Sequence, residues 1–203
     1  MMEVTIKEQL VESYNHHAEE RNGMEVADWK ARMRGTYLQL LEEAGARKLL
    51  EIGAGPGRDS LFFQLEGLDV TSTDLSPEMV RLCREKGLKA HVMDFGRLDF
   101  PDKSFDGVYA LNCLLHVPKQ ELPAVLAEIR RVLKPGGLFF LGVYGGPDSE
   151  GIWEKDHYVP KRFFSMYSDT QLLSVVEEMF RIVRFETVPM EDGAPHFQGL
   201  VLA

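Results

Sequence analysis

Three glycines that follow a short apolar run give the clearest indication of a ligand site. The apolar run covers residues 48–52, and the glycines lie in the segment Gly53-Ala54-Gly55-Pro56-Gly57. Glycine is needed where the main chain turns sharply and where a ligand must approach it closely. The third glycine follows the second by two residues instead of three, and no Lys-Ser or Lys-Thr pair follows. This spacing disfavours both the usual dinucleotide fingerprint and a phosphate-binding P-loop.

Two acidic residues follow later apolar runs and are candidates for binding a nucleoside. Asp74 ends the run at 69–73, about 20 residues beyond the glycines, where a carboxylate can accept hydrogen bonds from ribose hydroxyls. Asp94 follows the run at 89–93 and has an acceptor that suits an amino group. Each has a structural alternative, since Ser76-Pro77 starts a helix next to Asp74, and Asp94 can be a turn residue.

His116 is the best candidate for a general base. It follows the run at 105–111, on the side where ligands bind in open α/β sheets, and an imidazole titrates near neutral pH. Packing and helix capping are the alternative explanation for this histidine. Cys83 and Cys113 have no metal-like spacing, so no metal site is expected.

The apolar pattern predicts the elements that would position these residues. Strands are expected at 48–52, 69–73, 89–93, 105–111, 138–144, 182–188 and 197–203, and helices at 58–65, 118–133, 170–180 and after Ser76-Pro77. This alternation predicts a doubly wound α/β sheet with right-handed crossovers, whose last two strands form an antiparallel hairpin. Two extra helices are expected before the sheet, the first starting at a capping box of Thr5 and Glu8 and ending at Gly23. Residues 145–167 are expected to be irregular.

The chain resembles the class I S-adenosylmethionine-dependent methyltransferases, in particular the type 11/25-like small-molecule subfamily. Their first motif is an acidic residue, one spacer and Gly-x-Gly-x-Gly, and the segment from Glu51 to Gly57 matches every fixed position. The Lys134-Pro135-Gly136-Gly137 turn also matches, and together the matching segments cover about residues 48–144. The resemblance implies a Rossmann-like sheet of seven mostly parallel strands with an antiparallel last strand. It also implies S-adenosylmethionine as cofactor and S-adenosylhomocysteine as product.

The resemblance also assigns expected roles to residues. The glycine loop would carry the methionine part of the cofactor, with Glu51 either near its ammonium group or orienting the loop through water. Asp74 would bind the ribose, Leu75 would flank the adenine, and Asp94 would accept from the adenine amino group. The complete set of expected cofactor-binding residues is Tyr14, Glu51, Gly53, Ala54, Gly55, Gly57, Asp74, Leu75, Met79, Met93, Asp94, Phe95, Leu111 and Asn112.

A single domain is expected, with residues 1–46 as a helical cap, 47–144 as the cofactor-binding core, 145–167 as a substrate lid and 168–203 as a helix and hairpin. The lid segment is rich in aromatic residues, which would enclose an organic acceptor or simply cover the core. The expected substrate-binding residues are Trp153, Tyr158, Arg162 and Phe163, with Arg162 pairing with an acidic group of the acceptor.

Composition limits the possible partners. The chain has 32 acidic and 23 basic residues and a net charge of −9, which disfavours a nucleic acid as substrate. Its two cysteines and the absence of a secretory or membrane-spanning pattern lead us to expect a cytoplasmic monomer or homodimer that acts on a small molecule. A non-catalytic cofactor-binding or partner-activating protein of the same fold is the main alternative, and a nucleotide-dependent oxidoreductase is a weaker one.

Overall fold

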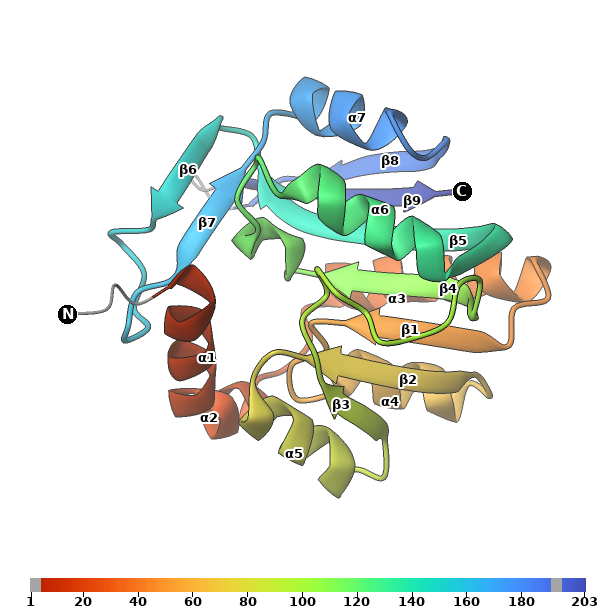
Figure 1. The fold of residues 1–203 in the computed structure, drawn as a ribbon, viewed down its shortest axis with the longest axis horizontal. Coiled ribbons are helices and arrows are strands. Elements are labelled where there is room, and N and C mark those ends of the chain that lie inside the picture. Colours follow the sequence, from red (N-terminus) through yellow and green to blue (C-terminus); the bar gives the residue numbers. More distant parts are fainter. Residues whose placement is uncertain (1–4, 191–194) are drawn as a thin grey trace.

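The computed structural model describes residues 5–190 and 195–203, and its centre is a seven-stranded sheet with helices on both faces (Figure 1). The strands follow the order β3-β2-β1-β4-β5-β9-β8. Their bounds are β1 Lys48–Ile52, β2 Asp69–Asp74, β3 Lys89–Val92, β4 Phe105–Leu111, β5 Leu133–Gly145, β8 Ile182–Val188 and β9 His196–Leu202. Strands β1 to β5 pair in parallel, and β9 pairs antiparallel with both β5 and β8. The structure confirms the predicted Rossmann-like sheet with an antiparallel last strand.

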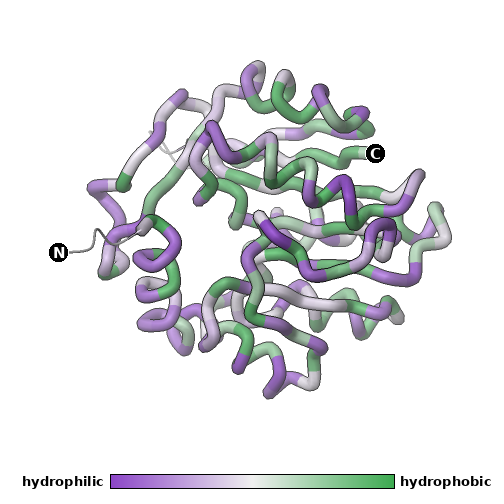
Figure 2. The backbone as a smooth tube through the Cα atoms, in the orientation of Figure 1, coloured by the Kyte–Doolittle hydropathy of each residue, from purple (hydrophilic) through white to green (hydrophobic). Residues whose placement is uncertain are grey.

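Helices cover the two faces of the sheet because alternate strand residues point to opposite sides. On one face, Leu50 and Ile52 of β1 share a core with α6 (Leu122–Val132) and α7 (Asp169–Glu177). On the other face, Leu49 packs with α3 (Asp28–Glu43) and α4 (Arg58–Leu65). Figure 2 shows the hydrophobic residues concentrated along the central strands and the hydrophilic ones along the outer sides of the helices. No helix in the described parts of the chain is long and apolar enough to cross a membrane.

The segment before α3 forms two helices, α1 (Ile6–His16) and α2 (Ala18–Gly23), where the sequence predicted one. The predicted capping box is present, with the Thr5 side chain accepting from the Glu8 amide and the Glu8 carboxylate accepting from the Thr5 amide. The helix is interrupted at His17, whose ring nitrogen Nδ1 donates to the Ser13 carbonyl at 2.8 Å. The Ser13 carbonyl thus accepts from both the ring and the main-chain amide of His17, the latter at 3.3 Å.

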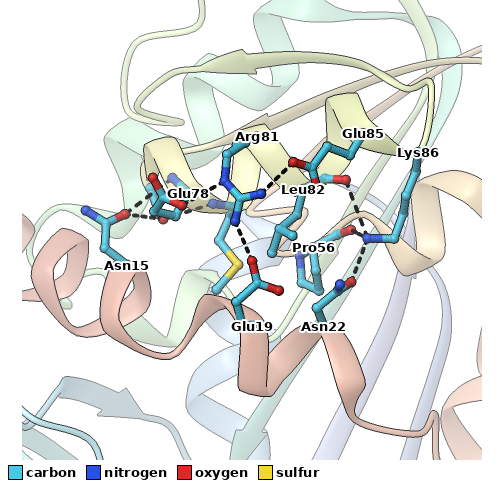
Figure 3. A network of polar contacts seen from close by, with 11 residues as sticks. Asn15, Glu19, Asn22, Pro56, Glu78, Arg81, Leu82, Glu85 and Lys86 are labelled. Carbon is cyan, nitrogen blue, oxygen red and sulfur yellow. Dashed lines mark hydrogen bonds and ion pairs between the residues drawn. The ribbon is translucent and has the colours of Figure 1, made fainter.

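The cap formed by α1 and α2 lies against α5 (Pro77–Glu85) through a row of polar contacts (Figure 3). Asn15 accepts from the Ser76 hydroxyl at 2.6 Å, and Glu19 pairs with Arg81 at 2.5 Å. Further along, Lys86 donates to the Asn22 side chain at 2.6 Å and to the Pro56 carbonyl at 2.8 Å. These contacts fix the cap over the carboxyl ends of the strands.

The prediction of an irregular segment at 145–167 was wrong for part of its length. Strands β6 (Ser149–Ile152) and β7 (Phe163–Met166) form a separate antiparallel ribbon. The side chains of Phe163, Phe164 and Met166 are all buried. Strand β7 therefore lacks the alternation of apolar and polar residues that identifies a half-exposed strand from sequence.

Candidate functional site

A cavity of about 600 Å³ lies at the carboxyl ends of the parallel strands and extends under α1. This is the edge of an open α/β sheet at which ligands bind. Ten of the residues expected in the site line this cavity: Tyr14, Gly53, Gly55, Asp74, Leu75, Asp94, Phe95, Leu111, Asn112 and His116. The fold therefore brings residues from four strand ends and the N-terminal cap into one space.

A second cavity of about 70 Å³ lies beside the first, over the glycine loop. It is lined by Glu51 and Ala54, and it shares Gly53, Gly55 and Asn112 with the larger cavity. Neither cavity is lined by Gly57, Met79 or Met93.

Met79 and Met93 were expected at the cofactor but pack elsewhere. Met79 is fully buried with Ala18 and Leu82, where it joins α5 to the cap. Met93 packs against the core under α6, and its sulfur accepts from the Asp99 amide at 3.4 Å. Their positions are explained by packing, because both side chains fill space between elements.

The three glycines of the loop differ in what a side chain at each position would contact. All have positive φ, at +62° for Gly53, +56° for Gly55 and +80° for Gly57. A Cβ atom on Gly53 would collide with Cys113, and one on Gly57 would lie 2.6 Å from a methyl carbon of Leu88. A Cβ atom on Gly55 would meet nothing within 4 Å. Gly55 is thus the position at which the bare main chain faces the open cavity.

Asp74 connects the glycine loop to the turn after β2. One carboxylate oxygen accepts from the Gly55 amide at 2.8 Å, and the other accepts from the Ser76 amide at 2.8 Å. Burial raises the pKa of Asp74, while the two amide hydrogen bonds act in the opposite direction. Each carboxylate oxygen keeps a free lone pair, so this side chain can still accept hydrogen bonds from a ligand in the cavity.

Glu51 is buried at the end of β1 and contacts α4. Its carboxylate accepts from the Ser60 hydroxyl, which also lies 2.6 Å from the Ser72 hydroxyl of β2. Burial raises the pKa of Glu51 well above its usual range, and the charge of Asp59 adds to the effect. The side chain joins β1, β2 and α4 beneath the loop and reaches only the small cavity.

Tyr14 and His116 form a hydrogen-bonded pair in the wall of the large cavity. His116 Nδ1 lies 2.6 Å from the Phe163 carbonyl, which only accepts, so Nδ1 carries the proton. Nε2 is then the acceptor for the Tyr14 hydroxyl, at 2.6 Å. The Arg162 guanidinium donates to the Tyr14 oxygen at 3.1 Å. Burial lowers the pKa of His116 to about 3, which makes it a weak base and favours a role in orienting Tyr14.

Arg21 was not selected from the sequence, yet it lines both cavities. Its Nη1 donates to the Tyr158 hydroxyl at 3.1 Å, and its Nε is buried without a hydrogen-bond partner among the described residues. A buried charged donor without a partner is costly unless a ligand satisfies it. No pattern in the sequence indicates this residue, because Arg21 follows the interruption at His17 and the direction of its side chain depends on how α2 docks.

Residues 50–141 match the family described as a methyltransferase domain. The chain belongs to the class I S-adenosylmethionine-dependent methyltransferases. It is 34 % identical over 146 residues to sterol 24-C-methyltransferase of Gibberella zeae, covering 66 % of this chain and 36 % of that one. It is 29 % identical over 173 residues to phosphoethanolamine N-methyltransferase 3 of Arabidopsis thaliana, covering 81 % and 34 %. The chain thus spans about a third of the length of these curated relatives.

A solved methyltransferase has the same fold over nearly the whole chain. It is the 1,6-didemethyltoxoflavin-N1-methyltransferase of Burkholderia thailandensis, with bound 1,6-didemethyltoxoflavin and S-adenosylhomocysteine. The TM-score is 0.73 at 23 % identity, with 95 % of this chain and 86 % of that chain covered. The matched length includes much more than the residues that carry the sequence motifs.

The structure places the four expected substrate-binding residues of the chain, Trp153, Tyr158, Arg162 and Phe163, outside the lining of both cavities. Arg162 forms a two-point ion pair with buried Asp156, at 2.8 and 2.9 Å, instead of being free for an acidic acceptor. This ion pair lowers the pKa of Asp156 to about 2. Tyr158 stacks on His17 with ring centres 3.9 Å apart, and Trp153 packs edge-on against Phe164.

Residues of the 145–167 segment therefore contact the site indirectly, through Tyr14 and His116. Phe163 supplies the carbonyl that binds His116, and Arg162 supplies the donor that binds Tyr14. The ribbon of β6 and β7 thus supports the wall of the cavity from behind. The sequence did not show which groups these side chains contact.

The low pKa of His116 predicts how stability depends on pH. The unfolded state binds a proton near the ordinary histidine pKa of about 6.5, while the folded state binds one only near pH 3. Stability therefore falls as the pH drops below about 6.5, and this residue should account for about 2 kcal/mol of the loss between pH 7 and pH 5. Urea unfolding measures the free energy of unfolding at both pH values. Between pH 7 and pH 5 this free energy should fall by about 2 kcal/mol more in the wild type than in His116→Asn. Equal losses in the two proteins would contradict the assignment.

Proposed function

We propose that the protein transfers a methyl group from S-adenosylmethionine to a small organic acceptor. The observation that carries this proposal is the junction of Gly55 and Asp74. The bare main chain of Gly55 and the carboxylate of Asp74 line one cavity and are hydrogen-bonded to each other. A site of this kind suits a ligand that has both an amino-acid part and a ribose.

The residues around this junction fit the parts of the cofactor. Asp74 would accept from the ribose hydroxyls, and Leu75 and Phe95 would flank the adenine. Asp94 would accept from the adenine amino group, although its oxygens already bind Lys7 at 2.5 Å and the Gly96 amide at 2.8 Å. A carboxylate has about four lone-pair sites, so a further hydrogen bond remains available.

The methionine end would lie over the glycine loop, near Leu111, Asn112 and Arg21. Asn112 has a φ of +56°, which asparagine tolerates better than most residues and which turns the chain away at the end of β4. The unpartnered Nε of Arg21 is a donor for the cofactor carboxylate. Glu51 remains a proposal for the ammonium group, supported by its place in the small cavity.

Arg21→Met tests this placement by comparing two ligands. We expect affinity for S-adenosylhomocysteine to fall by about tenfold or more, because a hydrogen bond to a charged group is worth about 1.5–3 kcal/mol. Affinity for 5′-methylthioadenosine, which lacks the amino-acid part, should change by less than about twofold. Calorimetric titration of both ligands measures the two changes. An equal loss for both ligands would show that Arg21 only supports the cavity wall.

When bound, the cofactor supplies a methyl group activated by a positively charged sulfur. The chain must then align an acceptor with that group and exclude water. Tyr14 would orient the acceptor, since its proton is directed to His116 and its oxygen retains a lone pair. A proton acceptor is needed only if the acceptor atom must lose a proton, and the pKa of about 3 argues against His116 in that role.

The activity is tested by incubating the protein with S-adenosylmethionine labelled in the methyl group and a metabolite extract. A labelled small product is expected, and Asp74→Ala should abolish it. Failure to bind S-adenosylhomocysteine at about 1 mM would overturn the proposed function. Cofactor binding with no label transferred to any small molecule would favour the non-catalytic alternative.

The remaining features of the proposal concern location and assembly. We propose a cytoplasmic protein, supported by two free cysteines, Cys83 and Cys113, which are both buried. We further propose that it acts as a monomer or homodimer, without nucleic acid or membrane as partner. Size-exclusion chromatography with light scattering distinguishes these two assemblies from larger ones. Residues 1–46, 47–144, 145–167 and 168–203 remain proposed units of one domain.

A further inference from the structure

Two sets of apolar side chains, from α1 and from the segment that leads into α6, line part of the large cavity. Helix α1 contributes one set, at the three- and four-residue spacing that places side chains on one helix face. The other set comes from Val117 and the first turn of α6. We call this space the apolar arm and define it by Ile6, Leu10, Val11, Val117, Ala124 and Val125.

The charged side chains that line the cavity are hydrogen-bonded or ion-paired, exposed to solvent, or shared with the small cavity. Lys7 is paired with Asp94 at 2.5 Å. Arg97 and Glu121 are exposed residues, so solvent can solvate their charges. Arg21 lines both cavities and lies toward the glycine loop. Among the described residues that line this space, none offers a buried, unpaired charge to a ligand in the arm.

Tyr14 and His116 are polar residues that line the same cavity and form a hydrogen-bonded pair. Tyr14 follows Leu10 and Val11 by four and three residues, so its ring lies on the same face of α1. The hydroxyl donates to His116 and accepts from Arg162, which leaves one lone pair for a ligand. A molecule in the arm would therefore meet apolar surface along its body and one polar contact at its inner end.

From this arrangement we infer that the methyl acceptor is a neutral, mainly apolar molecule with one nucleophilic polar atom near Tyr14. The inference rests on the proposed function and specifies the substrate class of the same site. A charged acceptor such as a phosphate ester would lose part of its solvation against these apolar side chains, which is unfavourable. An apolar body gains free energy from the contact area that it removes from water.

The test uses probes whose binding does not depend on methyl transfer. The protein is first saturated with S-adenosylhomocysteine, and binding of the neutral fluorophore N-phenyl-1-naphthylamine is then followed by its fluorescence increase. Displacement is compared for 1-naphthol and 1-naphthyl phosphate, which share a ring system and differ in charge. We expect saturable binding of the fluorophore, and we expect 1-naphthol to displace it at a concentration at least tenfold lower than the phosphate.

A matched pair of variants locates the probe in the arm. Ala124 and Ala127 are both exposed residues of α6, and only Ala124 lines the cavity. Ala124→Glu should weaken fluorophore binding at least fivefold by placing a carboxylate beside the apolar surface. Ala127→Glu adds the same charge one turn further along and should leave binding within twofold of wild type. Neither variant should change affinity for S-adenosylhomocysteine by more than twofold.

The possible outcomes separate this inference from the proposed function. The inference of an apolar acceptor is wrong if 1-naphthyl phosphate and 1-naphthol displace the fluorophore equally. It is also wrong if the two variants bind the fluorophore alike. The methyltransferase function stands in both cases. The same holds if S-adenosylhomocysteine binds but the fluorophore does not. If the fluorophore binds with the expected variant pattern and S-adenosylhomocysteine does not bind at all, the apolar arm stands and the proposed function fails.

Discussion

Asp74→Ala is expected to weaken binding of S-adenosylhomocysteine by about 100-fold. The carboxylate lines the cavity, and each of its oxygens has a lone pair directed away from its present amide partner. Two lost hydrogen bonds to a charged acceptor, at about 1.5–3 kcal/mol each, are sufficient for a change of this size. The variant also leaves the Gly55 amide without its acceptor, so the loop itself becomes less well positioned. Calorimetric titration measures the change, and a decrease of less than tenfold would mean that the ribose is bound elsewhere.

Asp69→Ala is the matched control for this variant. Asp69 starts the same strand that Asp74 ends, and it lies at the surface in an exposed ion pair with Lys89. An ion pair of this kind contributes little to stability. The control should therefore bind S-adenosylhomocysteine like the wild type, and both variants should keep a single cooperative thermal transition.

Gly55→Val is expected to abolish measurable binding of S-adenosylhomocysteine. Its side chain would extend from a main-chain position that has nothing within 4 Å and faces the cavity. The added methyl groups would therefore occupy the space proposed for the methionine part of the ligand. Isothermal calorimetry with ligand at about 1 mM should show no saturable heat. If the variant binds with wild-type affinity, the glycine loop is not part of the ligand site.

A backbone effect must be separated from this filling of the cavity. Gly55 has φ of +56°, at which a branched side chain costs roughly 1–2 kcal/mol or more. Gly45 offers a close match, because its φ is +67° and a Cβ there also meets nothing within 4 Å, yet it lines neither cavity. Gly45→Val should lower the thermal midpoint about as much as Gly55→Val and keep normal ligand affinity.

The sheet and half of the site were predictable because they depend on local sequence patterns. Strand β1 is a short apolar run that ends in glycines, and Asp74 ends the next strand. The ends of parallel strands meet at one edge, so residues at those ends converge without further information. Ser76 and Pro77 likewise specify the start of α5 through their own side chains.

The other half of the site depends on how distant elements dock, which local patterns do not specify. The apolar spacing of α5 predicts that Met79 is buried, but not that it faces the cap instead of the cavity. Arg162 is bound by Asp156 across the turn before β7, so the charge that seemed available for a substrate is already paired. Arg21 lies in α2, after the interruption at His17, and lines both cavities. None of these relations has a fixed spacing along the chain.

The contacts that hold the N-terminal cap on α5 give the cavity one wall that responds to salt. Arg81 and Glu19, which join the two parts, are both largely exposed, at 41 % and 70 % of their side-chain surface (Figure 3). Exposed ion pairs contribute about 0.2–1 kcal/mol each, and dissolved ions screen them. The strand ends, by contrast, are fixed by the main-chain hydrogen bonds of the sheet. Raising the ionic strength would thus weaken one link of the helical wall, while the buried contact of Met79 with Ala18 and the shape of the glycine loop are unaffected.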